Sequence, residues 1–167
     1  MLLVLVAAVV LWFLQMRRPE APSQYAGREL PPLEVAGWLN TNESITAADV
    51  RGKVVLLDFW ASDCGYCIQH IPDLAKLNER FKPLGLVMIG LTPEPEEGGQ
   101  LRRVMSTFDR MTWPIGYGAG NVFNAMGILG TPTYILYDRT GRSIWGGHSL
   151  SGVEDAIVEA MAKKQSS

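Results

Sequence analysis

Cys64 and Cys67 are the only cysteines of the chain, and they lie in the stretch DFWASDCGYCIQH, residues 58–70. Two thiols at this spacing allow three kinds of chemistry: a structural disulfide, part of a metal site, or a reactive pair that exchanges disulfides. The structural disulfide is the weakest of the three, because closing so short a loop removes little entropy from the unfolded chain.

The metal-site alternative would use both histidines of the chain. Cys64, Cys67 and His70 follow a C-x2-C-x2-H spacing, and His148 is the other histidine. A structural zinc site takes four ligands, so all four side chains would have to converge. A copper site of Cys64, Cys67 and His148 is a second version, since thiolate and imidazole both bind copper. We keep copper binding as a rival and predict no metal or cofactor for the main function.

The reactive pair is favoured by the position of Cys64, which follows an apolar run and opens a segment with helical spacing. The first N–H groups of a helix have no internal partner, and the helix dipole places positive charge there. Both effects favour a thiolate, so the pKa of Cys64 should fall below the usual value of about 8.5. Cys67 lies one turn further on the same face and can resolve a mixed disulfide formed at Cys64.

The segments around the cysteines predict a layered α/β domain. Residues 53–61 (KVVLLDFWA) and 85–92 (GLVMIGLT) are apolar without alternation, as in strands that are covered on both faces. Residues 64–81 have the spacing of an amphipathic helix, which Pro72 should kink. A helix between two covered strands is typical of α/β architecture.

Shorter elements are expected on either side of this unit. We expect a short strand with a glycine turn in residues 31–40, one helical turn at 46–52, helices at 96–111, 121–126 and 153–162, and strands at 133–138 and 143–145. The acidic segment PEPEEGG, residues 93–99, is expected to form a solvated loop near the active face.

The composition limits the class of protein. A chain of 167 residues with 47% hydrophobic residues can bury one core, and its net charge of −2 gives no electrostatic case for a nucleic-acid partner. We expect residues 1–16 to form a membrane anchor or signal-like segment, 17–27 a linker, 28–164 the folded domain and 165–167 a tail. Met1–Leu14 is apolar throughout and spans about 21 Å as a helix, against about 30 Å for a bilayer core. An uncleaved anchor is our interpretation, ahead of a cleaved signal.

The stretch VVLLDFWASDCGYC resembles the strand, CxxC motif and helix of the thioredoxin superfamily. More closely, residues 33–162 resemble the membrane-anchored TlpA- and ResA-like thiol–disulfide oxidoreductases, which are sometimes grouped with the redoxins. The resemblance implies a thioredoxin fold, with a central mixed β-sheet flanked by helices and an N-terminal hydrophobic helix. It also implies an extracytoplasmic domain, on the periplasmic side in a bacterium. Arg17 and Arg18 argue for the opposite side by the positive-inside rule.

The resemblance assigns the catalytic residues. Cys64 matches the exposed nucleophile, Cys67 the buried resolving cysteine, and Asp58 the buried acid that accepts the proton of the second cysteine. An unpaired carboxylate within an apolar run is costly, and burial should raise the pKa of Asp58. Many TlpA-like proteins have Asn at the position of Asp58.

The stretch GILGTPTYILYD resembles the family's cis-proline loop, with Pro132 as that proline and Thr131 before it. In the family the backbone of this loop pairs with an extended substrate as an added strand would. Tyr66, as an aromatic stacking surface, and Trp60, from the FWA motif, complete the expected substrate-binding set.

Three positions depart from the family pattern. Asp63 stands where the family usually has Trp, and an acidic neighbour opposes a thiolate at Cys64. The dipeptide Gly65-Tyr66 does not distinguish a reductant from an oxidant. His70 replaces a Glu of ResA-like proteins and is either a proton relay or a solvated residue. His148 is expected in a loop.

We therefore predict a membrane-tethered thiol–disulfide oxidoreductase that acts on protein thiols and disulfides and is recharged by an upstream thiol reductant. By family analogy with proteins of cytochrome c maturation, the direction is reduction. One rival is a peroxide-reducing redoxin, but the Pro-x-x-x-Thr-x-x-Cys setting of a peroxidatic cysteine is missing before Cys64. The other rival is a copper chaperone that uses Cys64, Cys67 and His148.

Overall fold

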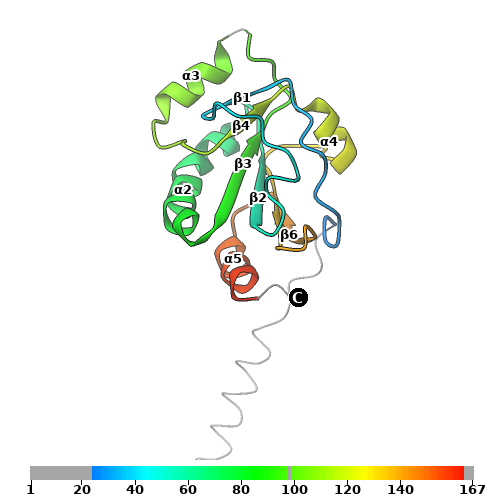
Figure 1. Cartoon of the computed structure of the whole chain (residues 1–167). Helices are drawn as coiled ribbons and strands as arrows, with labels where there is room; N and C mark the ends of the chain where they lie inside the picture. The colour runs from blue at the N-terminus through cyan, green and yellow to red at the C-terminus, as the bar shows by residue number, and fades with distance from the viewer. Residues whose placement is uncertain (1–23, 98, 164–167) are drawn as a thin grey trace, which may run out of the picture.

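A six-stranded mixed β-sheet in the order β1-β4-β3-β2-β5-β6 forms the centre of the computed structural model (Figure 1). The strands are β1 Gly37–Leu39, β2 Val54–Phe59, β3 Leu86–Leu91, β4 Ile115–Tyr117, β5 Thr133–Tyr137 and β6 Ser143–Gly147. Strands β2, β3 and β4 are parallel, whereas β1, β5 and β6 pair antiparallel with their neighbours. The structure describes residues 24–97 and 99–163. The predicted anchor and the tail therefore lie outside the described residues.

Helices cover both faces of this sheet (Figure 1). They are α2 Gly65–Phe81, followed by the short helix η1 Lys82–Leu84, and α3 Gln100–Thr107, α4 Gly120–Met126 and α5 Val153–Ala162. Buried residues of α2, α3 and α5 pack on one face, and those of α4 pack on the other face with the N-terminal segment. The predicted α/β class is confirmed. Among residues 24–97 and 99–163, no helix has the length and apolar character needed to cross a membrane.

Strand β2 is buried along its whole length, as its continuous apolar sequence predicts. Side chains of a strand alternate between the two faces of its sheet. Val54 and Leu56 accordingly pack on the α2 side, and Val55 and Leu57 pack on the α4 side. The same alternation places Asp58 on the α2 side, between Leu56 and the residue that follows the strand.

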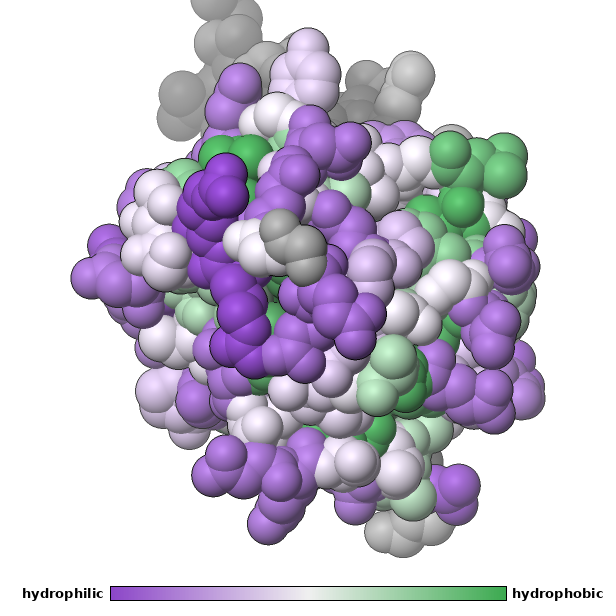
Figure 2. Space-filling model, turned by 90° about the horizontal axis from the view of Figure 1, so that it is seen from above, coloured by the Kyte–Doolittle hydropathy of each residue, from purple (hydrophilic) through white to green (hydrophobic). Residues whose placement is uncertain are grey.

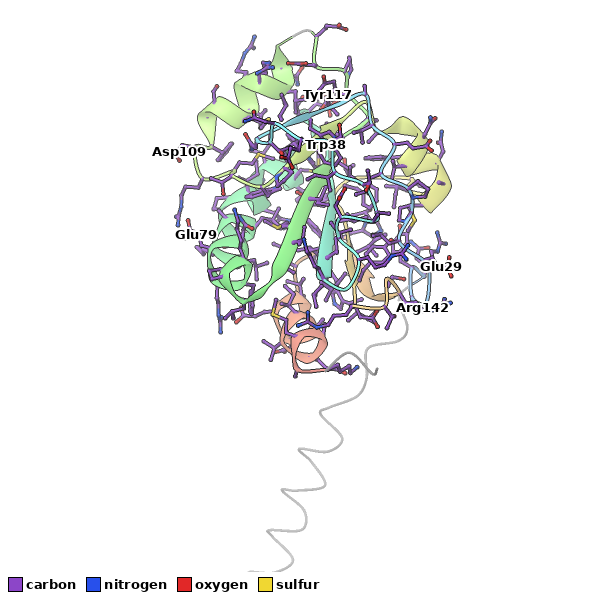
Figure 3. All side chains as sticks on the ribbon, viewed as in Figure 1. Glu29, Trp38, Glu79, Asp109, Tyr117 and Arg142 are labelled. Atoms are coloured by element: carbon purple, nitrogen blue, oxygen red, sulfur yellow. A yellow bond between two sulfur atoms is a disulfide. The ribbon has the colours of Figure 1, made fainter. Side chains whose placement is uncertain are left out.

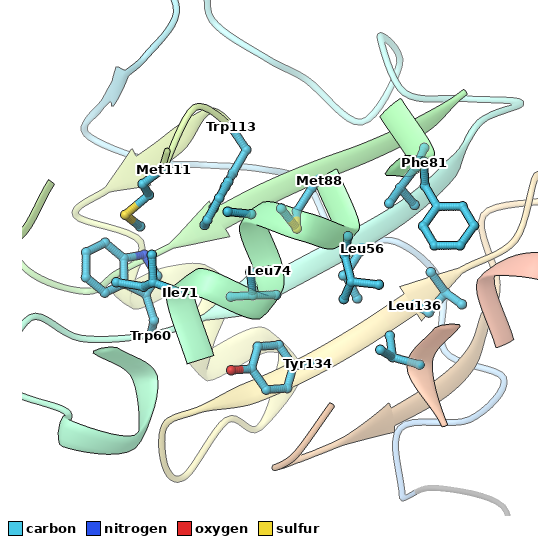
Figure 4. Packing of buried hydrophobic residues seen from close by; sticks show 14 of the residues in the cluster. Leu56, Trp60, Ile71, Leu74, Phe81, Met88, Met111, Trp113, Tyr134 and Leu136 are labelled. Carbon is cyan, nitrogen blue, oxygen red and sulfur yellow. The ribbon is translucent and has the colours of Figure 1, made fainter. Parts of the chain in front are cut away.

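The core on the α2 side contains large aromatic side chains next to the aliphatic residues of α2 (Figure 4). Trp60, Trp113 and Tyr134 are each at most 1% exposed. Figure 4 shows Tyr134 beneath α2, near Leu74, with its hydroxyl turned toward the side where Trp60 lies. This packing brings residues that are distant in sequence to the end of β2, where the cysteines follow.

Several predicted boundaries differ from the structure. Helix α3 is shorter than residues 96–111, because Gly99 in a left-handed conformation (φ 74°) precedes it and the chain leaves helical geometry at Phe108. Residues 46–52 form turns instead of a helical turn. Gly37 was expected in a turn, but it begins β1, where the Tyr117 ring of the neighbouring strand occupies the space of a side chain (Figure 3).

The folded part begins earlier than the predicted boundary at residue 28. Tyr25, assigned to the linker, is 3% exposed, and its carbonyl accepts a hydrogen bond from the Ser143 hydroxyl. The Gly27 N–H donates to the Ser143 carbonyl at 2.8 Å. Arg142 also faces Glu29 at 3.3 Å (Figure 3). These contacts fix the start of the described chain to strand β6.

Candidate active site

Cys64 and Cys67 form a disulfide at the start of helix α2, with their Cα atoms 5.2 Å apart. Cys64 is the N-cap of this helix, and its Sγ accepts the backbone N–H of Cys67 at 3.1 Å. Cys64 is half-buried, whereas Cys67 is 3% exposed. Only the first sulfur is thus accessible to a partner, and a helix N-terminus favours its thiolate form once the bond is reduced.

The turn before Cys64 is held by a carboxylate from the neighbouring loop. Glu94 accepts hydrogen bonds from the Ser62 N–H at 2.8 Å and from the Ser62 hydroxyl at 2.5 Å. The Thr92 hydroxyl donates to the same carboxylate at 3.0 Å. The sequence predicted a solvated charge cluster here. Instead, the hydrogen bonds of Glu94 connect the loop that follows β3 to the turn that precedes Cys64.

Asp58 lies on β2, the strand that precedes the cysteine pair, and is 2% exposed. Burial raises its pKa to about 8, as the sequence predicted in direction. Its neighbours across the ladder are Gly90 on β3 and Tyr134 on β5. Asp58 shares its face of the sheet with the buried side chain of Cys67.

The Thr131–Pro132 peptide bond is cis, as the resemblance implied. The loop is braced from two sides: the Thr133 hydroxyl donates to the Gly130 carbonyl at 2.7 Å, and Nδ1 of His148 lies 2.9 Å from the Pro132 carbonyl. His148 is thus in a loop, as predicted, but it contacts the proline loop. Its Nδ1 is directed at Pro132 and not at the sulfurs.

A cavity of about 440 Å³ opens between the cysteine helix and the proline loop. Its lining residues are Tyr66, His70, Gly130, Thr131, Pro132, His148 and Ser149. Tyr66 is 71% exposed, so its ring is available to a partner.

Figure 2 views the molecule from above, the end toward which strand β3 points in Figure 1. Hydrophilic residues cover much of this face, with a hydrophobic area to one side.

His70 connects this cavity to the core. Its Nδ1 lies 2.9 Å from the Tyr134 hydroxyl, across 64 positions of sequence. Burial, and in second place the charge of Asp58, raises the pKa of Tyr134 above its usual value. Tyr134 was not among the predicted site residues. The only signal in the sequence was its place two residues after Pro132 in a buried strand.

Trp60 does not occupy the position expected of a substrate-binding residue. Its side chain is 1% exposed and packs in the core on the α2 side, so no part of the ring reaches the cavity. The strand alternation that buries Asp58 also directs Trp60 inward. The prediction of direct substrate contact by Trp60 therefore has no support in its position. Asp63 is exposed.

The alternative of a metal site gains no support from the described part of the chain. No cluster of three or more His, Cys, Asp and Glu side chains there could hold a metal ion. His70 and His148 instead face Tyr134 and Pro132.

The fold and the disulfide at a helix N-terminus beside a cis-proline loop define a thioredoxin-like protein with a CxxC pair. The chain belongs to the redoxin family, whose model, described as Redoxin, matches residues 25–149. The predicted class of thioredoxin-like thiol–disulfide oxidoreductases is thereby confirmed at the level of the family.

Individual proteins agree with this assignment. The chain is 46% identical over 63 residues to protein DipZ of Mycobacterium bovis, covering 36% of this chain and 9% of DipZ. It is 33% identical over 104 residues to the thiol-disulfide oxidoreductase ResA of Halalkalibacterium halodurans, covering 61% of this chain and 57% of ResA. The chain thus spans less than two thirds of either relative. The crystal structure of a putative thiol:disulfide interchange protein DsbE from Chlorobium tepidum shares the fold, with a TM-score of 0.71 and 24% identity over 82% of this chain and 98% of that one.

Proposed function

We propose that this protein is a thiol–disulfide oxidoreductase that exchanges disulfides with protein substrates through Cys64 and Cys67. The observation that carries the proposal is the asymmetry of the pair, because an accessible sulfur at a helix N-terminus is backed by a buried one. The cavity between Tyr66 and the Pro132 loop adjoins this pair, and an extended substrate would lie there along the backbone of the loop. The names of the relatives support the same chemistry.

In the reducing direction the reaction has two steps. The Cys64 thiolate attacks a substrate disulfide, so a mixed disulfide forms and one substrate thiolate leaves. Asp58, in its ionised form, accepts the proton of Cys67. The Cys67 thiolate then attacks the Cys64 sulfur, which forms the Cys64–Cys67 disulfide and releases the second substrate thiolate. The two protons of the dithiol end on the two substrate thiols, the second by way of Asp58 and solvent.

Reduction is the proposed direction, supported by the resemblance to ResA-like proteins. We further propose that the apolar segment Met1–Leu14 tethers the domain to a membrane on its extracytoplasmic side. An upstream thiol reductant would then recharge the pair. Arg17 and Arg18 are the evidence against this side, so a topology reporter fused to the C-terminus is the direct test.

Trapping of mixed disulfides tests the exchange activity. A Cys67→Ser chain keeps the attacking sulfur but cannot resolve, so it should accumulate substrate adducts that dithiothreitol releases. A Cys64→Ser chain is the matched control and should accumulate few adducts, because its remaining sulfur is buried. Equal capture by both variants would contradict the assigned roles.

The reduction potential of the Cys64–Cys67 pair tests the direction. A value at or below roughly −230 mV identifies a reductant, and a value near −120 mV identifies an oxidant. Absence of a reversible couple would remove the oxidoreductase proposal altogether.

A further inference from the structure

Three buried side-chain atoms of the described residues have no hydrogen-bond partner: Oδ1 of Asp58, Nε1 of Trp60 and Nε1 of Trp113. Buried polar groups without partners cost free energy and are therefore rare in folded proteins. All three residues belong to the α2 side of the sheet, and Figure 4 shows both indole rings there. One hydrogen-bond acceptor and two donors therefore remain unpaired in the same core.

The space beside Gly90 brings the two indole N–H groups close together. A methyl group built on Gly90 would lie 2.4 Å from Cδ1 of Ile115 and 3.2 Å from Nε1 of both Trp60 and Trp113. Gly90 is the direct neighbour of Asp58 in the β2–β3 ladder. Adjacent strands lie about 4.8 Å apart and directly paired residues point to the same face, so the Asp58 carboxyl borders the same space.

The chemistry of the three groups is complementary. An indole N–H can only donate a hydrogen bond, and an ionised carboxylate can only accept one. A protonated carboxyl is a weaker acceptor, so the indoles favour the ionised form.

The other surroundings of Asp58 offer no competing stabilisation. From β5 it faces Tyr134, whose hydroxyl is engaged with His70, and α2 contributes the buried Cys67 to the same core. Gly90 of β3 has no side chain. Burial is the only cause that raises the pKa of Asp58, and no cation counteracts it.

We propose that Trp60 and Trp113 are positioning residues whose indole N–H groups stabilise the ionised form of Asp58, so that this carboxylate can take the proton of Cys67. The inference rests on the proposed function, because the proton transfer belongs to that reaction. It gives Trp60 a role in the core in place of the substrate contact expected from the sequence. It also adds Trp113, for which the sequence offered no signal.

The first test uses the unaltered full chain in detergent, oxidised, with ¹⁵N-labelled indoles and ¹³C-labelled carboxyls. The indole signals of Trp60 and Trp113 should shift with pH at the same midpoint as the Asp58 carboxyl. Those of Trp38 and Trp145 should not follow that midpoint. In an Asp58→Asn chain the shifts of Trp60 and Trp113 should disappear. Indole signals that stay constant through the Asp58 titration overturn the proposal.

The second test is Trp113→Phe, which keeps an aromatic ring and removes one donor. Loss of a hydrogen bond to a charged group should raise the pKa of Asp58 by about one unit or more. The pH profile of the resolving step should move upward by the same amount. Trp38→Phe is the matched control and should leave the midpoint unchanged. An unchanged midpoint in Trp113→Phe overturns the role of Trp113.

These readouts separate the two proposals. If the chain shows no disulfide exchange but the indoles titrate with Asp58, the proposed function fails and the stabilisation of the carboxylate stands. If exchange occurs and the indoles ignore Asp58, the positioning role fails alone.

Discussion

Replacing Asp58 by Asn should make the folded protein more stable at neutral and alkaline pH, although it removes the proposed proton acceptor of Cys67. The carboxyl of Asp58 is fully buried, and burial raises its pKa from 3.8 to about 8. The folded state therefore holds this proton more tightly than the unfolded state does. Below pH 3.8 the carboxyl is neutral in both states and imposes no penalty. Stability falls as pH rises from there and levels off above pH 8.

The magnitude follows from the size of the shift. About four units at 1.36 kcal/mol per unit correspond to a penalty of about 5 kcal/mol at pH 9, and half of it is reached near pH 6. Asn carries no charge at any pH, so the Asn variant lacks the pH-dependent penalty of ionising a buried carboxyl. Its buried amide adds a constant cost of about 1–3 kcal/mol that does not change with pH. The difference in unfolding free energy between the variant and the unaltered chain should therefore shift in favour of the variant by several kcal/mol as the pH rises from 4 to 9.

Urea unfolding of the oxidised full chain in a non-ionic detergent, at pH 4, 6, 7.5 and 9, measures this difference. Other titrating groups are shared by both chains and cancel in the comparison. Asp49→Asn is a control of opposite sign, because hydrogen bonds from Thr46 lower the pKa of this exposed carboxyl. It should bring no gain at high pH. A stability difference for Asp58→Asn that stays constant between pH 4 and pH 9 would refute the reasoning.

The remaining predictions concern the contacts around the pair. Gly90→Ala should lower the free energy of unfolding by about 1–3 kcal/mol, because the added methyl group overpacks the core, chiefly against Ile115 and less against the two indoles, whereas Gly120→Ala, into open space, should change it little. Glu94→Gln should cost about 1–2 kcal/mol in urea unfolding and shift the reduction potential, because it weakens the bonds that hold the turn before Cys64. Tyr134→Phe should cost about 1 kcal/mol in urea unfolding and move the side-chain NMR signals of His70 at constant pH, because it removes their hydrogen bond.

Each of these has a clear contrary outcome. Equal stability of the two glycine variants would show that the core relaxes around Gly90. A Glu94→Gln chain with an unaltered potential would mean that the turn before Cys64 does not influence the thiols. Side-chain NMR signals of His70 that stay in place in the Tyr134→Phe chain would contradict the contact between these two residues.

Local sequence patterns were sufficient to predict most of the helices and strands. The apolar run of β2 and the periodic spacing of α2 are properties of adjacent residues, and both elements form within one or two residues of the predicted bounds. Strand β4, Ile115–Tyr117, was missed because three residues carry too little pattern to distinguish a strand from a loop. Helix α3 was predicted too long for a related reason, since the glycine that precedes it offered only a weak start signal.

The sequence by itself determined the reactive pair and its immediate chemistry. A CxxC motif between a covered strand and a helix places the first sulfur at a helix N-terminus, whatever the rest of the chain does. The cis Thr131–Pro132 bond was expected from the resemblance of GILGTPTYILYD to the cis-proline loop of the family. The position of the first sulfur depends on neighbouring residues, so a linear pattern is sufficient to predict it, whereas the cis bond was predicted only through the resemblance.

Only the tertiary structure decided what surrounds this pair. Three features join residues from different strands and loops. His70 contacts Tyr134, Glu94 accepts a hydrogen bond from Ser62, and the indole of Trp113 lies close to Gly90, the ladder neighbour of Asp58. Such neighbours are set by strand order and register, which depend on the packing of the whole core. A one-residue change in register would turn every side chain of a strand to the other face, and no local pattern fixes that choice between distant segments.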